Sequence, residues 1–178
     1  NDSTGVVIWL GANQDTVTTN TVSRNTRSGI LVLGEDTIDN AITINYIGTN
    51  ADGDLLGNCP RGIVLSQNSV NTRINWNEIG DQTEYGIVIG CGSHHNRVVH
   101  NYIGTDATAT LDLGNTGGGI LLAASNNIIG RPEMGGGNVI CFNEGWGIQG
   151  SAAVKCSSNT IIGNLIGTNS RDEMMGND

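Results

Sequence analysis

The sequence predicts an all-β fold, a parallel β-helix (solenoid) of about six coils with inserted loops. Two short phrases recur along the chain, one starting with Gly and one centred on Asn, and the runs between turns are short and β-branched. The 178 residues include 27 Gly, 23 Asn and only 2 Pro. Small and β-branched residues with few helix formers are typical of short strands and tight turns. We therefore interpret residues 1–178 as a single β-helix domain, and expect it to be part of a longer solenoid.

The Gly phrase sets the repeat length. It reads GILVLG at Gly29 and GIVIGC at Gly86, and successive copies are spaced by 24, 33, 24, 33 and 28 residues. Its six copies begin at Gly5, Gly29, Gly62, Gly86, Gly119 and Gly147. The first and third positions after the Gly are aliphatic, as in Ile30 and Val32, and a period of two places them on one face of a strand. One repeat has too few apolar groups to fold alone, so stacked repeats must share one core.

The Asn phrase describes a corner of each coil. It reads TINYIGTN at 43–50, VVHNYIGTD at 98–106 and IIGNLIGTN at 161–169. An Asn side chain bonds backbone groups at tight turns, and stacked Asn residues bond one another as a ladder. Gly is expected where a corner needs a positive φ. The anchor residues of the six repeats are Asn20, Asn45, Asn77, Asn101, Asn138 and Asn164.

The longer repeats carry inserted loops after the IGT triplet, at 50–61 and 106–118. The first begins NADGD, in which Asn50, Asp52 and Asp54 alternate oxygen ligands in the manner of a calcium loop. The distal bidentate Glu of an EF-hand is missing, and Asp-Gly is also an ordinary turn. Calcium is therefore the one cofactor that the sequence leaves open, and none is established.

The composition argues against nucleic acid as a partner and against a membrane-spanning segment. The net charge of −9 would repel a phosphate backbone, so no nucleic-acid partner is expected. No apolar run approaches the roughly 18 residues of a membrane span. The chain starts without Met and shows no signal peptide, so we expect a mature form or an excised piece. Disulfides and buried free thiols both remain open for the four cysteines, which match no zinc pattern. They are Cys59, Cys91, Cys141 and Cys156.

The G-I-x-I/L and N-x-I-x-x-N-x-I-G-T phrases resemble right-handed parallel β-helix repeat proteins of the pectin lyase-like superfamily. The likeness covers essentially the whole chain and extends to bacterial secreted or surface proteins with N-Y-I-G-T-D repeats. It implies a right-handed coil and a secreted or cell-surface location. Superfamily members include polysaccharide lyases, hydrolases, epimerases, adhesins and phage tailspikes, so the fold does not give the function. Their catalytic motifs are missing here, and catalytic residues stay unassigned.

Stacking the repeats gathers a candidate carbohydrate-binding patch on one lateral face. Arg73 and Arg97 occupy the same position in neighbouring coils, four residues before the anchor Asn. Aromatic and acidic side chains flank the anchors of the same coils. Flat rings beside Arg and a carboxylate can stack on sugars and bond uronate groups. The alternative is an ordinary solvated face. The candidate residues are Tyr46, Arg73, Trp76, Glu78, Arg97, His100 and Tyr102.

A second column predicts an apolar ridge. The second position after the repeat Gly should point outward, yet it is aliphatic in five coils. A contiguous exposed ridge marks an interface or is covered. We favour cover by the inserted loops over self-association through the ridge. End-to-end association is also open, because a terminal coil exposes unpaired strand edges. The ridge residues are Val7, Leu31, Val64, Val88 and Leu121.

The sequence thus favours a non-catalytic structural or adhesive extracellular module that binds an acidic polysaccharide or other glycan on a lateral face. The alternative hypothesis is a polysaccharide lyase or epimerase whose catalytic residues the sequence does not identify. Calcium-dependent turnover of an anionic polysaccharide would separate the two.

Overall fold

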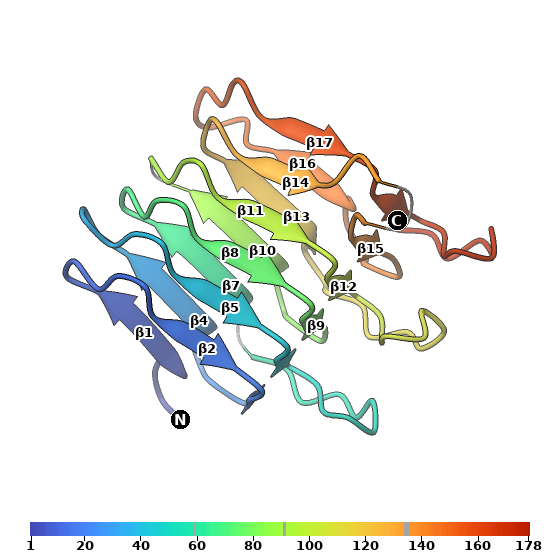
Figure 1. Ribbon diagram of the computed structural model, residues 1–178. Helices are drawn as coiled ribbons and strands as arrows, with labels where there is room; N and C mark the ends of the chain where they lie inside the picture. The colour runs from blue at the N-terminus through green and yellow to red at the C-terminus, as the bar shows by residue number, and fades with distance from the viewer. Residues whose placement is uncertain (59, 91, 134–135) are drawn as a thin grey trace.

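The computed structural model describes residues 1–58, 60–90, 92–133 and 136–178. Its strands form three sheets of six strands each, and every strand pair within them is parallel. Each repeat contributes one strand to each sheet, and the repeats follow one another along the stack (Figure 1). The predicted parallel β-helix of about six coils is therefore confirmed.

The first sheet carries the Gly phrases, and the other two carry the residues on either side of the anchor Asn. The first sheet consists of β1 (Val6–Trp9), β4 (Ser28–Leu33), β7 (Arg61–Ser66), β10 (Tyr85–Gly90), β13 (Gly118–Ala123) and β16 (Ile148–Gly150). The second consists of β2 (Thr16–Thr18), β5 (Ala41–Thr43), β8 (Arg73–Asn75), β11 (Arg97–Val99), β14 (Ile128–Gly130) and β17 (Thr160–Ile162). The third consists of β3 (Thr21–Val22), β6 (Tyr46–Ile47), β9 (Glu78–Ile79), β12 (Tyr102–Ile103), β15 (Val139–Ile140) and β18 (Leu165–Ile166).

Columns of aliphatic side chains fill the centre of the stack. Ile63 pairs in register with Ile30 and with Ile87, and all three are fully buried. The second and third sheets add parallel columns that include Ile74 and Ile79, also fully buried. Full burial of one such side chain is worth about 1.5–3 kcal/mol. The inward phase expected from the period of two is correct.

The repeat Gly is required by close approach rather than by a positive φ. A Cβ built on Gly29 would lie 2.8 Å from the carbonyl oxygen of Gly62 in the next coil. None of the internal repeat glycines has a positive φ, whereas Gly48 and Gly104 of the IGT triplets have φ values of 78° and 81°. The expectation of positive φ therefore holds for the IGT corner and is wrong for the Gly phrase.

Hydrogen-bonded ladders of polar side chains run along all three corners. In the first, the amide of each anchor residue donates to the next, as from Asn77 Nδ2 to Asn101 Oδ1 at 2.9 Å. The ladder expected from the sequence is confirmed: it comprises Asn20, Asn45, Asn77, Asn101, Asn138 and Asn164. A second ladder joins Asn25, Asn58, Gln82, Asn115, Asn143 and Asn177. These ladders satisfy buried amides that would otherwise cost about 1–3 kcal/mol each.

The third ladder is interrupted at Thr72. The Asp15 amide donates to Asn40 Oδ1, and further along Asn96 Nδ2 donates to Asn127 Oδ1 at 3.0 Å. Between them Thr72 is fully buried, and its Oγ1 is the one buried side-chain polar atom without a partner among the described residues. The hydroxyl is too short to bridge the two neighbouring coils. Asn40 therefore meets no side-chain acceptor at position 72, whereas the Thr72 backbone amide still donates to Asn96 Oδ1 at 2.8 Å, so the break in this ladder lies between coils two and three.

The inserted loops leave the stack at the IGT corner and lie beside one another (Figure 1). Asn169 Nδ2 of the last loop donates to the Ala109 carbonyl of the loop before it.

The apolar ridge predicted from the second position after the repeat Gly is covered unevenly. Val64 and Val88 are only 8% and 9% exposed, whereas Val7 is 45% exposed. Pro60, at the end of the first inserted loop, lines a hollow with Leu31 and Val64. The described residues contain no helix long and apolar enough to cross a membrane.

Candidate functional site

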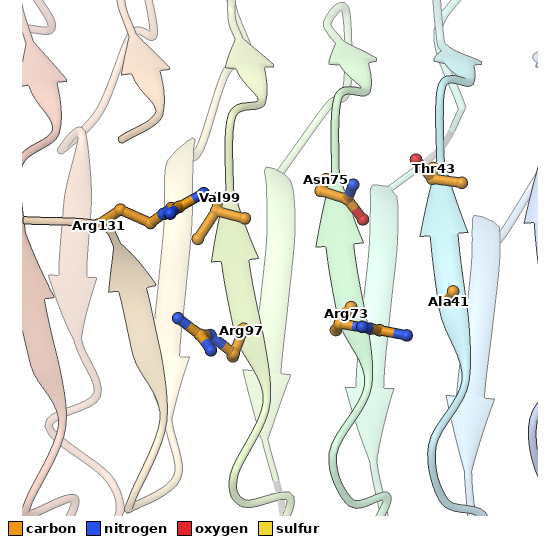
Figure 2. Close-up of a pocket in the computed structure, with 7 residues that line it drawn as sticks. All are labelled: Ala41, Thr43, Arg73, Asn75, Arg97, Val99 and Arg131. Atoms are coloured by element: carbon orange, nitrogen blue, oxygen red, sulfur yellow. The ribbon is translucent and has the colours of Figure 1, made fainter. Parts of the chain in front are cut away.

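A shallow hollow on the outer face of the second sheet is the candidate site. Arg73 and Arg97 pair in register on β8 and β11, and both are exposed. The alternation that buries Ile74 and Val98 turns these two arginines outward. The hollow measures about 450 Å3 and is lined by Ala41, Thr43, Arg73, Asn75, Arg97, Val99 and Arg131 (Figure 2).

Arg131 adds a third guanidinium that the repeat pattern did not reveal. The residue in register with Arg97 in the next coil is Ile128, and Arg131 follows just after the end of β14. Figure 2 shows the Arg131 side chain reaching toward Val99, on the same side of β11 to which Arg97 extends. Arg131 also forms an ion pair with Glu133 at 3.0 Å. Three of the seven arginines in this acidic chain thus line one hollow.

Arg73 and Arg97 form no ion pair in the described part of the chain, where the ion pairs are Arg61–Glu84, Arg131–Glu133 and Arg171–Glu173. After the hydrogen bonds from the Glu133 backbone and from Arg131, the charge of Arg97 contributes to lowering the pKa of Glu133, the partner of Arg131.

A second hollow shares Ala41, Arg73 and Arg97 with the first and is also lined by Asp39. The Asp39 Oδ1 atom accepts a hydrogen bond from Asn71 Nδ2. The two guanidinium groups extend in opposite directions from their strands, Arg97 toward Arg131 and Arg73 toward Ala41 (Figure 2). Their positive charges are therefore spread along the hollow rather than held at one point.

The aromatic corner lies where β8 and β11 end. Trp76 and His100 have φ values of 59° and 56°, and their rings stack with centroids 4.2 Å apart and planes 7° apart. Trp76 remains 51% exposed. Burial lowers the pKa of His100, and the positive charge of Arg131 lowers it further, so the stacked imidazole is neutral at pH 7. One face of the indole that we expected to meet a sugar is therefore occupied by His100.

The remaining patch residues lie on the third sheet, around the corner from the arginines. Tyr46, Glu78 and Tyr102 are in register on β6, β9 and β12, each half-buried. Burial raises the pKa of Glu78; the Ala107 N–H lowers it and the charge of Asp106 raises it again. The Glu78 carboxylate is thus turned toward the inserted loop. The structure groups the predicted residues as an arginine face, an aromatic corner and a tyrosine face rather than as one flat patch.

The predicted calcium residues form a self-contained loop. Asn50 Oδ1 accepts from the backbone amides of Asp52 and Asp54, each at 3.0 Å. Asn50 Nδ2 donates to Asp54 Oδ2 at 2.9 Å. The corresponding Asn169 makes the same set of bonds in its loop. Asn50 Oδ1 and Asp54 Oδ2 are thus engaged inside the loop, whereas the Asp52 carboxylate is exposed, and the calcium site stays a prediction.

Possible donors for softer metals are scattered. Cys141 is fully buried, its thiol donates to the Thr168 carbonyl, and burial raises its pKa. Cys141 and Cys156 are free, whereas Cys59 and Cys91 lie outside the described residues, so the pairing question stays open for them. No group of three His, Cys, Asp or Glu side chains converges within the described ranges. One pair does converge: His94 Nδ1 and His95 Nδ1 are 2.7 Å apart.

Comparison with known proteins places this β-helix in a family. Residues 1–139 match the family model described as periplasmic copper-binding protein (NosD). The chain belongs to the NosD family. NosD proteins share the right-handed β-helix of the pectin lyase-like group, which confirms the resemblance seen in the repeats. No curated protein and no solved structure matches.

The family description raises the question of whether this NosD-family chain has residues that fit copper. Copper in proteins is held by imidazole, thiolate and thioether groups. The buried Cys141 stays a protonated thiol, because burial raises its pKa, and is a poor ligand. The His94–His95 pair has two ring nitrogens close enough to share one metal ion. No third His, Cys, Asp or Glu side chain joins this pair within the described ranges, so the described residues do not form a complete set of copper ligands.

Proposed function

We propose that this protein is a non-catalytic, extracytoplasmic β-helix module that binds an acidic glycan over the arginine face. The observation that carries the proposal is the pair Arg73 and Arg97, in register and without an ion pair among described residues. The family description as periplasmic supports the location outside the cytoplasm. A secreted or cell-surface position is part of the same proposal.

The geometry favours an extended anionic chain over a small anion. The hollow continues from Arg131 across β11, β8 and β5 to Gln14 and Thr16 of the first coil. Ala41 stands where the next coils carry arginines, and its short side chain leaves room for the Arg73 guanidinium (Figure 2). Guanidinium groups bind carboxylates in bidentate geometry, and neighbouring Asn75 and Thr43 offer hydrogen bonds to hydroxyls. Uronates carry both groups on each ring.

The decisive experiment measures binding to an acidic polysaccharide and a neutral polysaccharide at low and moderate salt. Arg73→Gln with Arg97→Gln should weaken acidic-glycan binding at least tenfold, since charge-assisted bonds contribute about 1.5–3 kcal/mol each. Trp76→Ala with Arg97→Ala should abolish it if the aromatic corner also contacts the sugar. Arg24→Gln with Arg171→Gln is the matched control, because it removes the same charge from exposed sites elsewhere.

Equal losses in the arginine-face variant and in the control would reduce the effect to net charge and refute the site. Unchanged affinity in both would refute acidic-glycan binding by this face. The lyase form of the enzyme hypothesis is tested on the same material, because a lyase would leave new unsaturated ends on any glycan that binds, whereas a binding module or an epimerase would leave none.

A further inference from the structure

The second hollow, which continues the arginine face toward the first coil, carries charge of both signs. It measures about 490 Å3, and Arg73 and Arg97 line it together with the carboxylate of Asp39 from coil two. Gln14 and Thr16 of coil one line its far end. A ligand that lies along the arginine face toward coil one therefore meets a negative charge after the guanidinium groups.

Asp39 is held in a fixed position at this place. It is exposed and has a φ of 59°, and its amide donates to the Val70 carbonyl of the next coil at 3.1 Å. Asn71 Nδ2 donates to Asp39 Oδ1, whereas Asp39 Oδ2 accepts no hydrogen bond from the described residues. One oxygen of the carboxylate is thus anchored, and the other is free to meet a ligand.

The opposite charges in this hollow do not neutralise each other. Arg73 and Asp39 both line it, but no ion pair joins them in the described part of the chain. Figure 2 shows the Arg73 side chain extending toward Ala41, its partner in register on β5, two residues after Asp39. The guanidinium and the carboxylate are therefore both presented over coil two, and each can bind an opposite charge on a ligand.

The position of Asp39 bears on which acidic glycan fits. Coils are about 4.8 Å apart, close to the length of one sugar residue, so successive sugars of an extended chain meet successive coils. A chain of uronates alone would bring a carboxylate against Asp39, and like charges in contact disfavour binding. A chain in which acidic sugars alternate with amino sugars would offer a carboxylate to the arginines and an ammonium group to Asp39. Both contacts are then charge-assisted hydrogen bonds.

We propose that Asp39 selects, among acidic glycans, those in which acidic sugars alternate with sugars that carry a free amino group. Arg73 and Arg97 bind the acidic sugar, and the Asp39 carboxylate binds the ammonium group of its neighbour. This inference rests on the acidic-glycan binding proposed above and adds to it the residue that determines specificity.

The test compares three oligosaccharides of equal length by calorimetry. They are a hyaluronan fragment, in which glucuronate alternates with N-acetylglucosamine, the same fragment after N-deacetylation, and an oligogalacturonate. At about pH 6 the freed amino group is protonated, as an α-amino group is. N-deacetylation makes the fragment less negative, so a face that responds to net charge alone must bind it more weakly. We expect the deacetylated fragment to bind at least tenfold more tightly than either of the others.

Asp39→Asn removes the carboxylate but keeps an oxygen for Asn71 and a side chain that tolerates the left-handed conformation. It should reverse the preference, so that the acetylated fragment and the oligogalacturonate bind more tightly than the deacetylated fragment. Asp36→Asn is the matched control, because Asp36 is also exposed, has a φ of 60° in the same coil and lines neither hollow. This variant should keep the preference of the unaltered protein.

The outcomes separate this inference from the proposed function. Weaker binding of the deacetylated fragment by the unaltered protein, or an unchanged preference in Asp39→Asn, would overturn selection by Asp39 and leave acidic-glycan binding in place. Equal changes in the Asp36 and Asp39 variants would assign the effect to net charge and overturn it as well. No binding of any of the three oligosaccharides would refute acidic-glycan binding itself, and this inference with it.

Discussion

The interior and the outer face of this solenoid follow different rules. Inside, each coil repeats the same side chains, so that Ile30, Ile63 and Ile87 form one column and the anchor asparagines form another. Outside, positions in the same register change from Ala41 to Arg73. In the interior, stacking favours the same residue type in every coil, because each side chain packs on the equivalent side chain of the neighbouring coil. The outer face is free of that requirement, so its departures from the repeat are where function is to be sought.

The strongest test of the contrast compares adjacent residues on the two sides of one strand. Ile63→Ala or Ile87→Ala should lower the free energy of unfolding by about 2–5 kcal/mol, because each empties a fully buried site. Val64→Ala or Val88→Ala should cost less, about 1.5 kcal/mol, because each removes only two methyl groups, and these side chains, although only 8% and 9% exposed, lie outside the central column. Urea denaturation measures all four. Equal losses on both sides would remove the distinction between interior and outer face.

Repairing the interior should raise stability where the repeat is broken. Thr72→Asn places an amide in the third ladder, where it can donate to Asn96 Oδ1 and accept from Asn40. We expect a gain of about 1–2 kcal/mol from two added hydrogen bonds. Thr72→Val is the control, because it removes the unpaired hydroxyl without adding an amide and should change stability less. A destabilised Thr72→Asn protein beside a neutral Thr72→Val protein would show that the corner cannot hold the larger side chain.

The inserted loops offer the smallest expected effect. Burial alone would raise the pKa of Asp106, but hydrogen bonds from Thr108, Leu111 and Thr110 outweigh it and hold the pKa at about 2. Because this lies below the ordinary value of 3.8, the stabilising contribution is present above pH 4 and is lost as the pH falls toward 2. We expect roughly 1 kcal/mol, reduced by solvent at the rim of the loop.

Asp106→Asn should keep the loop, since Asn50 and Asn169 hold the corresponding loops with the same backbone bonds. The variant should match the unaltered protein at pH 7 and lose less stability between pH 4 and 2. Unfolding free energies at those values provide the measurement, with the exposed Asp52→Asn as the charge-matched control. An identical acid loss in the unaltered protein and Asp106→Asn would contradict the assigned role.

The sequence was sufficient for the coil, the inward phase and the first ladder, because each depends on a residue type repeated at a constant offset. The second ladder has its own constant offset, four residues before each repeat Gly, as Asn25, Asn58 and Asn115 show. That signal was present and was missed because Gln82 interrupts the run of asparagines. The third ladder lies five residues before most anchors, and the insertion at 131–137 breaks its spacing in coil five.

The candidate sites were less accessible to sequence reasoning. Register placed Arg73 beside Arg97, but Arg131 comes from an insertion that no periodic offset can position. The stacking of Trp76 on His100 depends on ring rotamers, which a repeat pattern does not specify. The approach of His94 to His95 depends on one left-handed residue, and neighbouring coils carry Asn, Asp and Gln at that position without a second imidazole.

The gap at Thr72 also has a consequence for how the stack comes apart. In a linear array each coil is held only by its two neighbours, so the weakest interface decides where cooperative unfolding stops. Coils two and three share a ladder with one rung missing, and we expect the protein to behave as two folding units that meet there. Amide protons of the first two coils should then exchange together, at a rate distinct from those of coils three to five. In the Thr72→Asn variant the completed ladder should join the two folding units, so that the amide protons of all these coils exchange at one rate.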